Sequence, residues 1–506
     1  MIRTILSNTG ANFAFRAFSM VLAFVSVPIL VGSLGAAGYG ILLLADSLMG
    51  YFSVLSAGVP AGTVKFVAEY EAKGEHDTVF AVIGSSLTFF LGAGLLVAGA
   101  VAAFTAFGGV ELFRLDSDLV RSAESVLYLA AALAVFSWPS GTFGQTLDGL
   151  QRYGENRIAV GLGNTVGRLL SIAAAIAGAP IEGVFIASQA GIPLTAALQY
   201  RAVAKALPGW ALRRLRYDRD TFQTMFGYSV WMLVQKISAL LLYHTDRIIL
   251  SLFLSVESIT IYHVVTRPFN YIKEFSMLST QALMPAVSAA EARRGRSGLD
   301  GFIYLAGRYS NAFLAPLAVI GTYLSGPLIG LWMGPDYLPY AWIAQSACLF
   351  QLIWQANAML GRVFSGTGVV KRITLIGLFG ALINVPLGIW WVQTIGVAGV
   401  VFSTMAAAGI SIPLQYAFAM PELRIDRSRY LLNGVVRGQM PAWLLGLVLL
   451  PFWTRIQSIA SWATFVVIGL VMGIVFYSVI WKTVVESRHR IVFLSFVPAS
   501  LRPGSA

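Results

Sequence analysis

The sequence predicts an all-α polytopic membrane protein with about 14 transmembrane helices. Of its 506 residues, 57% are hydrophobic and only 11% are charged, whereas about 25% of the residues of a soluble domain are charged. The mean hydropathy is +0.75. A helix needs about 20 apolar residues to cross a bilayer, and apolar windows of that length follow one another along the chain. A soluble globular protein and a domain with one membrane anchor are therefore both excluded.

Six apolar windows occupy the first part of the chain. Gly, Pro and charged residues separate them, and such residues mark the ends of apolar helices. Arg3 and Asn8 precede the first window and no small-residue cleavage site follows it, so we expect a retained span and not a signal peptide. The six windows lie at residues 11–34, 39–62, 79–107, 122–146, 157–178 and 182–204.

Eight further windows follow a basic stretch at residues 205–221, the longest connection between windows. Its length and its central place predict a linker between two halves of six helices each. Since no connection exceeds about 20 residues, we expect no extramembrane domain that could hold a soluble active site. The eight windows lie at residues 224–254, 259–287, 304–332, 338–361, 372–394, 397–419, 431–453 and 459–482.

A short repeat supports the division into halves. Residues 71–74 (Glu-Ala-Lys-Gly) follow the second window, and the similar residues 291–295 (Glu-Ala-Arg-Arg-Gly) follow the eighth. A repeat of six spans returns to the same side of the membrane, so the halves are expected to be parallel. We therefore predict a first lobe at residues 1–206, a second lobe at 207–421, and two additional helices with a tail at 422–506.

Basic residues are distributed unequally between alternate connections. The net charge is +12, and most Lys and Arg outside the windows fall in connections that would share the side of the N-terminus. Only Arg114, Arg121 and Arg455 fall on the other side. Because cytoplasmic loops carry the excess of Lys and Arg, we predict cytoplasmic N- and C-termini and an even number of spans. The positive charge is thus explained by membrane topology, and no nucleic-acid partner is expected.

Basic residues also occur within the windows, where a charge at the bilayer centre costs at least about 2.5–3.5 kcal/mol. They are expected to face a water-filled interior. Helical spacing agrees, because Asn12 and Arg16 share one face, as do Asn164, Arg168 and Ser171. The predicted substrate-binding residues are Asn12, Arg16, Arg168, Lys236, Arg267 and Lys273.

Alternatives remain for several of these cations. Arg308 and Arg437 lie close to helix ends and are expected to snorkel to the interface, and Arg16 could do the same. Arg247 lines the interior, pairs with its neighbour Asp246, or lies near the outer interface. Arg267 precedes Pro268, which frees backbone carbonyls, so a structural role there is the alternative to substrate binding.

Three carboxylates within the windows are candidates for coupling transport to H⁺ or Na⁺. They are Asp46, Asp246 and Glu274. A buried carboxylate exchanges a proton or holds a cation; the alternative is that each neutralises a nearby Arg or Lys. Asp46 has no basic residue within one helical turn, so it is the preferred coupling candidate.

Motifs for enzymatic chemistry are missing from the sequence. It contains no phosphate-binding Gly loop with a Lys, no paired His ligands and no nucleophile elbow. The single cysteine, Cys348, excludes a disulfide within the chain. We expect no cofactor and no resident metal.

Several short motifs together resemble the polysaccharide-transport (Wzx-type O-antigen flippase) family of the multidrug/oligosaccharidyl-lipid/polysaccharide superfamily. The resemblance covers the whole chain in helix number and repeat. The motifs are Asn12 with Arg16, residues 28–31 (Pro-Ile-Leu-Val), Leu34-Gly35, residues 38–40 (Gly-Tyr-Gly), residues 246–249 (Asp-Arg-Ile-Ile) before Tyr262, and residues 331–334 (Leu-Trp-Met-Gly) with Tyr337.

The resemblance implies a MATE-like bundle of two six-helix lobes, with two extra C-terminal helices, that works by alternating access. Its implied substrate is an undecaprenyl-pyrophosphate-linked oligosaccharide, moved from the cytoplasmic to the periplasmic leaflet of the bacterial inner membrane. Glycosyltransferases and a polysaccharide polymerase are the implied protein partners. The cations within the windows fit such a substrate independently, because a diphosphate is anionic and accepts charge-assisted hydrogen bonds.

Three other functions remain open at this point. A lipid II flippase would share the helix number and the basic interior. An ion-coupled multidrug exporter would be expected to present carboxylates to cationic drugs. A membrane polymerase or ligase would be an enzyme with a large periplasmic loop, whereas the longest outer connection here is residues 107–121. We therefore expect a transporter and not an enzyme.

Overall fold

The computed structural model describes two compact units, Met1–Thr260 and Ile261–Ala506. The described residues are 2–52, 58–227, 237, 240–241, 244–280, 287, 291, 299–367, 370–423, 425–487 and 489–490, with the backbone alone for 2–17, 226–227, 278–279, 365 and 370. Within these ranges all regular elements are helices, which confirms the predicted all-α class. The lobe boundaries expected from the sequence, after residues 206 and 421, stay predictions.

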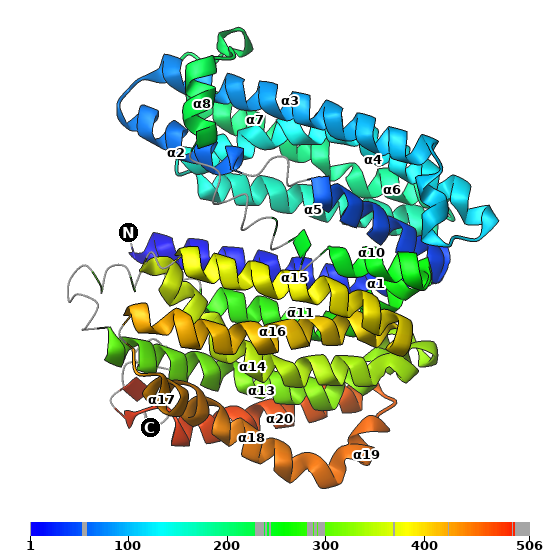
Figure 1. Cartoon of the computed structure of the whole chain (residues 1–506), viewed down its shortest axis with the longest axis vertical. Helices are drawn as coiled ribbons and strands as arrows, with labels where there is room; N and C mark the ends of the chain where they lie inside the picture. The colour runs from blue at the N-terminus through cyan, green and yellow to red at the C-terminus, as the bar shows by residue number, and fades with distance from the viewer. Residues whose placement is uncertain are drawn as a thin grey trace. The chain divides into compact units, whose positions relative to one another are not determined.

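The first unit contains the N-terminal helices (Figure 1). Its α3 and α4 pack along each other, α5 packs against α1, α6 and α7, and α10 packs against α1. The helices are α1 (Ile2–Phe52), α2 (Val59–Ala72), α3 (His76–Ala106), η2 (Gly109–Phe113), α4 (Ser117–Gly149), α5 (Tyr153–Ile176), α6 (Ile181–Gln189), α7 (Gly191–Ala206), η3 (Leu212–Arg214), α8 (Arg219–Gly227) and α10 (Thr245–Phe253).

A sharp break at Gly35 divides α1 into two arms. The backbone φ of Gly35 is +73° and its ψ is 169°, a conformation that glycine adopts without a steric penalty. The two arms correspond to the first two windows of the sequence, and Figure 1 shows α1 changing direction between them. The second arm ends at Phe52, before the end of the window at 39–62.

Small residues bring α5 close to α6 and α7. A Cβ at Gly191 would overlap the carbonyl of Gly163, and a Cβ at Gly167 would overlap the carbonyl of Ser188. Glycine at such crossings lets two helix backbones approach closely in a membrane. This contact fixes α5, which carries Arg168, against the neighbouring helices.

The second unit is built around the long helix α13. It packs against α14, α18 and α20. The helices are α11 (Val256–Thr280, which begins in the first unit), α13 (Asp300–Met333), η5 (Pro335–Tyr340), α14 (Ala341–Gly366), α15 (Val370–Ile395), α16 (Val397–Phe418), η6 (Met420–Leu423), α17 (Arg427–Arg429), η7 (Tyr430–Val436, a π-helical turn), α18 (Arg437–Leu449), η8 (Leu450–Phe452), α19 (Trp453–Gln457) and α20 (Trp462–Thr483).

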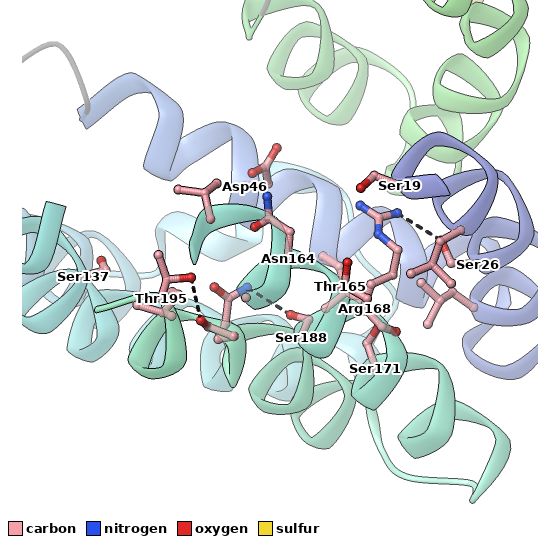
Figure 2. Close-up of a pocket in the computed structure, with 18 of the residues that line it drawn as sticks. Ser19, Ser26, Asp46, Ser137, Asn164, Thr165, Arg168, Ser171, Ser188 and Thr195 are labelled. Carbon is pink, nitrogen blue, oxygen red and sulfur yellow. Dashed lines mark hydrogen bonds between the residues drawn. The ribbon is translucent and has the colours of Figure 1, made fainter. Parts of the chain in front are cut away.

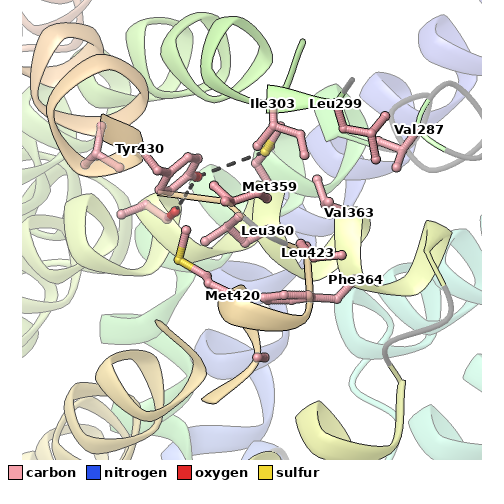
Figure 3. Packing of buried hydrophobic residues seen from close by; sticks show 14 residues of the cluster. Val287, Leu299, Ile303, Met359, Leu360, Val363, Phe364, Met420, Leu423 and Tyr430 are labelled. Atoms are coloured by element: carbon pink, nitrogen blue, oxygen red, sulfur yellow. Dashed lines mark hydrogen bonds between the residues drawn. The ribbon is translucent and has the colours of Figure 1, made fainter. Parts of the chain in front are cut away.

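An apolar core surrounds Tyr430 in this unit (Figure 3). The ring is fully buried beside Leu360, Phe364 and Met420. Its hydroxyl donates a hydrogen bond of 3.0 Å to the carbonyl of Ala356, because a buried hydroxyl without a partner would be costly. The π-helical turn that begins at Tyr430 is thereby attached to α14.

Ten helices in the described part of the chain are long and apolar enough to cross a membrane. This agrees with a multi-pass membrane protein, whereas the total of 14 stays a prediction. The first two windows count as one, because they form the two arms of α1. The windows at 224–254 and 259–287 fall partly outside the described residues. Helix α14, with Gln345, Gln351, Gln355 and Asn357, is not among the ten.

Candidate functional site

A polar cavity of about 760 Å³ lies within the first unit. Segments of α1, α4, α5, α6 and α7 form its walls, and Figure 2 shows their polar side chains converging. Most polar groups in the walls are uncharged hydroxyls and amides. They belong to Ser19, Ser26, Ser137, Ser140, Asn164, Thr165, Ser171, Ser188, Gln189, Thr195 and Gln199.

Both arms of α1 contribute to this cavity. Ser19, Ser26 and Leu30 line it from the first arm, and Tyr39 and Asp46 line it from the second. In one straight helix, Ser26 and Asp46 would be about 30 Å apart, at 1.5 Å per residue. The break at Gly35 is therefore what brings both arms to the same cavity.

Arg168 projects into the cavity from α5 (Figure 2). Its Nη1 donates a hydrogen bond of 3.1 Å to Ser26 Oγ, and Ser26 in turn donates to the carbonyl of Ala23 at 2.9 Å. Asn164 and Ser171, one turn to either side of Arg168, also line the cavity. The polar face predicted for this helix thus lines the cavity as a unit.

Asp46 lines the same cavity and is paired with Arg247 of α10. Arg247 Nη1 lies 2.9 Å from Asp46 Oδ2 and 3.2 Å from Ser47 Oγ. The Asp46 side chain is 69% exposed, whereas that of Arg247 is only 19% exposed. Figure 2 shows the Asn164 amide pointing toward Asp46. Arg247 therefore forms its ion pair with a carboxylate distant in sequence, and Asp46 is a partly neutralised group at the cavity wall.

A chain of hydrogen bonds supports one wall of the cavity. Gln199 Nε2 donates to Asn156 Oδ1 at 2.7 Å, and Asn156 Nδ2 donates to Asp148 Oδ1 at 2.8 Å. The buried hydroxyl of Thr165, by contrast, has no hydrogen-bond partner among the described residues. Because buried polar atoms are normally paired, this hydroxyl is suited to a water molecule or a polar ligand.

A smaller cavity of about 200 Å³ adjoins the first. Both are lined by Asp46, Ser137 and Gln189. The far wall of the smaller cavity is apolar, with Trp138 and Phe185 among its residues. The combined space therefore changes from polar to apolar beyond Asp46.

Two of the predicted substrate-binding cations, Arg267 and Lys273, lie on α11 in the second unit, and each contacts the face of an aromatic ring. The Arg267 guanidinium is 5.0 Å from the centre of the Tyr271 ring, and its Nε donates to the Tyr271 hydroxyl at 3.3 Å. Lys273 Nζ is 5.0 Å from the centre of the Trp354 ring. Such cation–π contacts orient the two cations on α11.

The remaining predicted residues are placed as follows. Asp246 is buried at the start of α10, and Glu274 lies half-buried on α11. The side chains of Asn12 and Arg16, and all of Lys236, lie outside the described residues. Of the predicted site residues, the described cavity brings together Arg168 and Asp46.

Sequence reasoning missed most of the hydroxyl and amide groups of the cavity. Uncharged polar residues are common in membrane helices, where they also join helices to one another, so single serines gave no signal. A usable signal was their spacing, because Ser19 and Ser26 repeat at seven residues and fall on one helix face.

Two comparisons of the sequence agree with one another. A family profile described as "Polysaccharide biosynthesis protein" matches residues 5–291. The chain is 21% identical over 480 residues to "Uncharacterized membrane protein EpsK" of Bacillus subtilis (strain 168), with 92% of each chain covered. It is also 21% identical over 379 residues to the "Putative O-antigen transporter" of Shigella flexneri, covering 71% of this chain and 83% of that one.

Solved structures show the same architecture. The lipid II flippase MurJ, in an inward closed conformation, superposes with a TM-score of 0.67 at 14% identity, over 93% of this chain and 99% of that one. An inward-facing multidrug resistance MATE family transporter superposes with a TM-score of 0.64 at 16% identity, over 80% and 95%. These similarities concern the fold, and they confirm the predicted MATE-like bundle.

Proposed function

The chain belongs to the polysaccharide biosynthesis protein family, and from this premise we propose that it is a flippase for an undecaprenyl-pyrophosphate-linked oligosaccharide. It would move this substrate from the cytoplasmic to the periplasmic leaflet of the bacterial inner membrane by alternating access. The relatives and structural neighbours whose names state an activity are transporters or flippases, so the chain is a transporter and not an enzyme, as the sequence predicted.

The observation that carries this proposal is one cation in a cavity of hydroxyls and amides. Arg168 supplies N–H donors with a full positive charge, the preferred partner of a phosphate oxygen. The surrounding Ser, Thr, Asn and Gln side chains donate and accept hydrogen bonds, as sugar hydroxyls require. The volume of about 760 Å³ falls in the ordinary range of ligand sites. A cavity for cationic drugs would instead need a surplus of carboxylates.

The other predicted basic residues extend this proposal. Our candidates for further contacts to the diphosphate are the amide of Asn12 and the basic residues Arg16, Lys236, Arg267 and Lys273. Cytoplasmic termini and cooperation with glycosyltransferases and a polymerase belong to the same proposal.

Asp46 is our candidate for H⁺ or Na⁺ coupling, ahead of Asp246 and Glu274. Its carboxylate faces the cavity and holds Arg247 at 2.9 Å. Binding of a proton or a sodium ion by Asp46 would compete with that ion pair. Binding of an ion to Asp46 would thereby weaken the ion pair that joins α10 to α1 through Arg247.

The experiment follows a fluorescent prenyl-diphosphate oligosaccharide between the leaflets of vesicles that contain the purified protein. Arg168→Ala is expected to slow flipping about tenfold or more, because a charge-assisted hydrogen bond contributes about 1.5–3 kcal/mol. Arg168→Lys should retain part of the rate. Arg157→Ala is the matched control, since Arg157 is exposed on the same helix and is not among the cavity residues.

Normal flipping by Arg168→Ala, in protein that inserts and unfolds like the unaltered chain, would overturn the assigned role of the cavity. Faster flipping of lipid II than of other lipid-linked glycans would assign the chain to peptidoglycan synthesis. Uptake of a cationic drug without any lipid flipping would assign it to drug export.

A further inference from the structure

The chain between α7 and α10 contains a basic segment, residues 207–227, that is fixed to the side of α3. We call it the connecting segment. Trp210 anchors its first part, with ring centres 6.0 Å from Phe80, 6.4 Å from Phe143 and 5.8 Å from Tyr200. Aromatic contacts of this kind add stability beyond the area they bury. The segment is thus an ordered part of the first unit.

Backbone contacts hold its middle part. Ser85 Oγ donates to the carbonyl of Asp218 at 3.2 Å and accepts from the Asp218 N–H at 2.9 Å. A Cβ at Gly84 would overlap the backbone of Arg216, so only glycine on α3 allows this close approach. At the start of α8, Asp218 Oδ2 accepts from the Thr221 N–H at 3.0 Å, and Met225 is fully buried.

The outward side of the connecting segment combines arginines with apolar side chains. Arg213, Arg216 and Arg219 are exposed and form no direct ion pair in the part of the chain that the structure describes, although the charge of Arg216 also acts on the nearby Asp218 carboxylate. Two apolar side chains adjoin them in sequence: Leu212, next to Arg213, is 56% exposed, and Tyr217, next to Arg216, is 51% exposed. The neighbouring Arg214 differs, because its Nη1 donates to the Gly209 carbonyl at 3.0 Å and its guanidinium lies over the Phe80 ring. Three cations are therefore available to an external partner.

The orientation of the segment suits a membrane surface. Figure 1 shows α8 crossing the direction of α3, and α3 is apolar and long enough to span the bilayer. Trp210 and Asp218, which flank the exposed arginines Arg213 and Arg216, contact α3 at Phe80 and Ser85, about 6 and 14 Å from the start of a helix about 46 Å long. A segment at that level, running across a spanning helix, lies close to the plane of the lipid headgroups.

We propose that the connecting segment is a binding surface for anionic phospholipid headgroups. Leu212 and Tyr217 enter the boundary between headgroups and acyl chains, and Arg213, Arg216 and Arg219 contact lipid phosphates. The connecting segment contains four Arg and two Asp, and one of these two, Asp218, accepts a hydrogen bond from the Thr221 N–H. This charge surplus favours acidic over zwitterionic lipid. The inference does not depend on the identity of the transported substrate.

The test measures which lipid lies beside residue 212. The one native cysteine, Cys348, is fully buried, so a fluorophore is attached to the introduced cysteine of Leu212→Cys. The protein is placed in vesicles of phosphatidylcholine with a minority of phosphatidylglycerol, and one lipid at a time carries brominated, quenching acyl chains. Quenching per mole fraction is expected to be about threefold greater for phosphatidylglycerol.

Two changes should bring this ratio to one. The first is the triple variant Arg213→Gln, Arg216→Gln, Arg219→Gln. The second is high salt with the native arginines, since about 0.5 M salt shortens the Debye length to about 4 Å. This measurement does not depend on the folding of the triple arginine variant. Leu112→Cys is the matched control, because Leu112 also lies in a short 3-10 turn and is 59% exposed, and it should show no preference.

Equal quenching by both lipids with the native arginines would overturn the proposal, as would a preference that survives both changes. Absence of quenching by either lipid would place residue 212 in water. That outcome would also overturn the proposal, and it would assign the surface to a soluble acidic partner.

Discussion

Asp46 and Arg247 are 201 residues apart in the sequence and form an ion pair of 2.9 Å between α1 and α10. A second contact close by attaches the start of α11 to α1, because Thr260 Oγ1 donates to the carbonyl of Ala36 at 2.7 Å. Both α10 and the start of α11, which follow the connecting segment in sequence, therefore contact α1. The first compact unit consequently extends to Thr260.

Removing either partner of this ion pair should lower the free energy of unfolding, but by unequal amounts. Asp46→Asn leaves the largely buried cation of Arg247 without its carboxylate, whereas Arg247→Gln leaves a carboxylate that is mostly exposed. We expect a loss of about 1–2 kcal/mol for Asp46→Asn and less than about 1 kcal/mol for Arg247→Gln. A double-mutant cycle from thermal unfolding in detergent measures both values and the coupling. Equal losses, or a coupling of zero, would contradict the pairing.

Asp46 should also determine the response of transport to an ion gradient. In Asp46→Asn the side chain keeps its size but has no carboxyl group to take up a proton and no negative charge to attract Na⁺. We expect the flipping rate in vesicles to become insensitive to an imposed H⁺ or Na⁺ gradient. Glu111→Gln, at an exposed carboxylate of η2, serves as the control and should keep the native response. A native response in Asp46→Asn would remove Asp46 as the coupling group.

The close contact between α5 and α7 makes Gly191 intolerant of a side chain. Because a Cβ at Gly191 would overlap the Gly163 carbonyl, Gly191→Ala should destabilise the protein by about 1–3 kcal/mol. At Gly154, on α5, a Cβ would meet no atom within 4 Å, so Gly154→Ala should be neutral or slightly stabilising. Thermal unfolding of the two variants checks this contrast, and similar transition temperatures would refute it.

The attachment of α8 should weaken in acid. Hydrogen bonds from the Thr221 side chain and backbone lower the pKa of Asp218 below its ordinary value, which is about 3.9. The stabilisation is therefore present above that value and is lost as the pH falls through the lowered pKa. Fluorescence anisotropy of a label at residue 212 should fall in this acidic range. In Asp218→Asn the anisotropy should not change with pH there, and a change identical to that of the native residue would assign the effect to another group.

Cys348 should be inert in the folded protein. Its side chain is fully buried on α14, with Sγ 3.5 Å from Ser325 Oγ. A maleimide reagent is expected to label the unaltered protein only after denaturation, and mass spectrometry measures the fraction labelled. Rapid labelling of the folded protein would show that α14 is accessible from outside the core.

The charged part of the candidate site could be predicted because charge is rare in apolar windows. Arg168 and Asp46 stand out in such windows, and helical spacing places Asn164 and Ser171 on the face of Arg168. All four line the cavity. The all-helical, multi-pass character could also be predicted, because the length of apolar windows is governed by the thickness of the bilayer and needs no tertiary information, whereas the number of 14 spans stays a prediction.

The partner of Asp46 could not be predicted, because it is a property of the tertiary fold. Asp246 is adjacent to Arg247 in sequence, but adjacent residues on a helix do not face each other. The direction of Arg247 toward α1 depends on how α10 packs, which one-dimensional patterns do not contain. The role of the serines that line the cavity could not be predicted either. A hydroxyl in a membrane helix commonly donates to a carbonyl of its own helix, as Ser47 does to Leu43, so its presence alone does not indicate a cavity.

The turn at Gly35 has a consequence for how the wall of the cavity is built. Residues 18–52 form two apolar arms joined without a loop, so the arms meet at almost no cost in chain entropy. Ser26 and Asp46, one on each arm, thus belong to one continuous stretch of chain, and this part of the polar wall depends on a single backbone turn and not on the docking of distant segments.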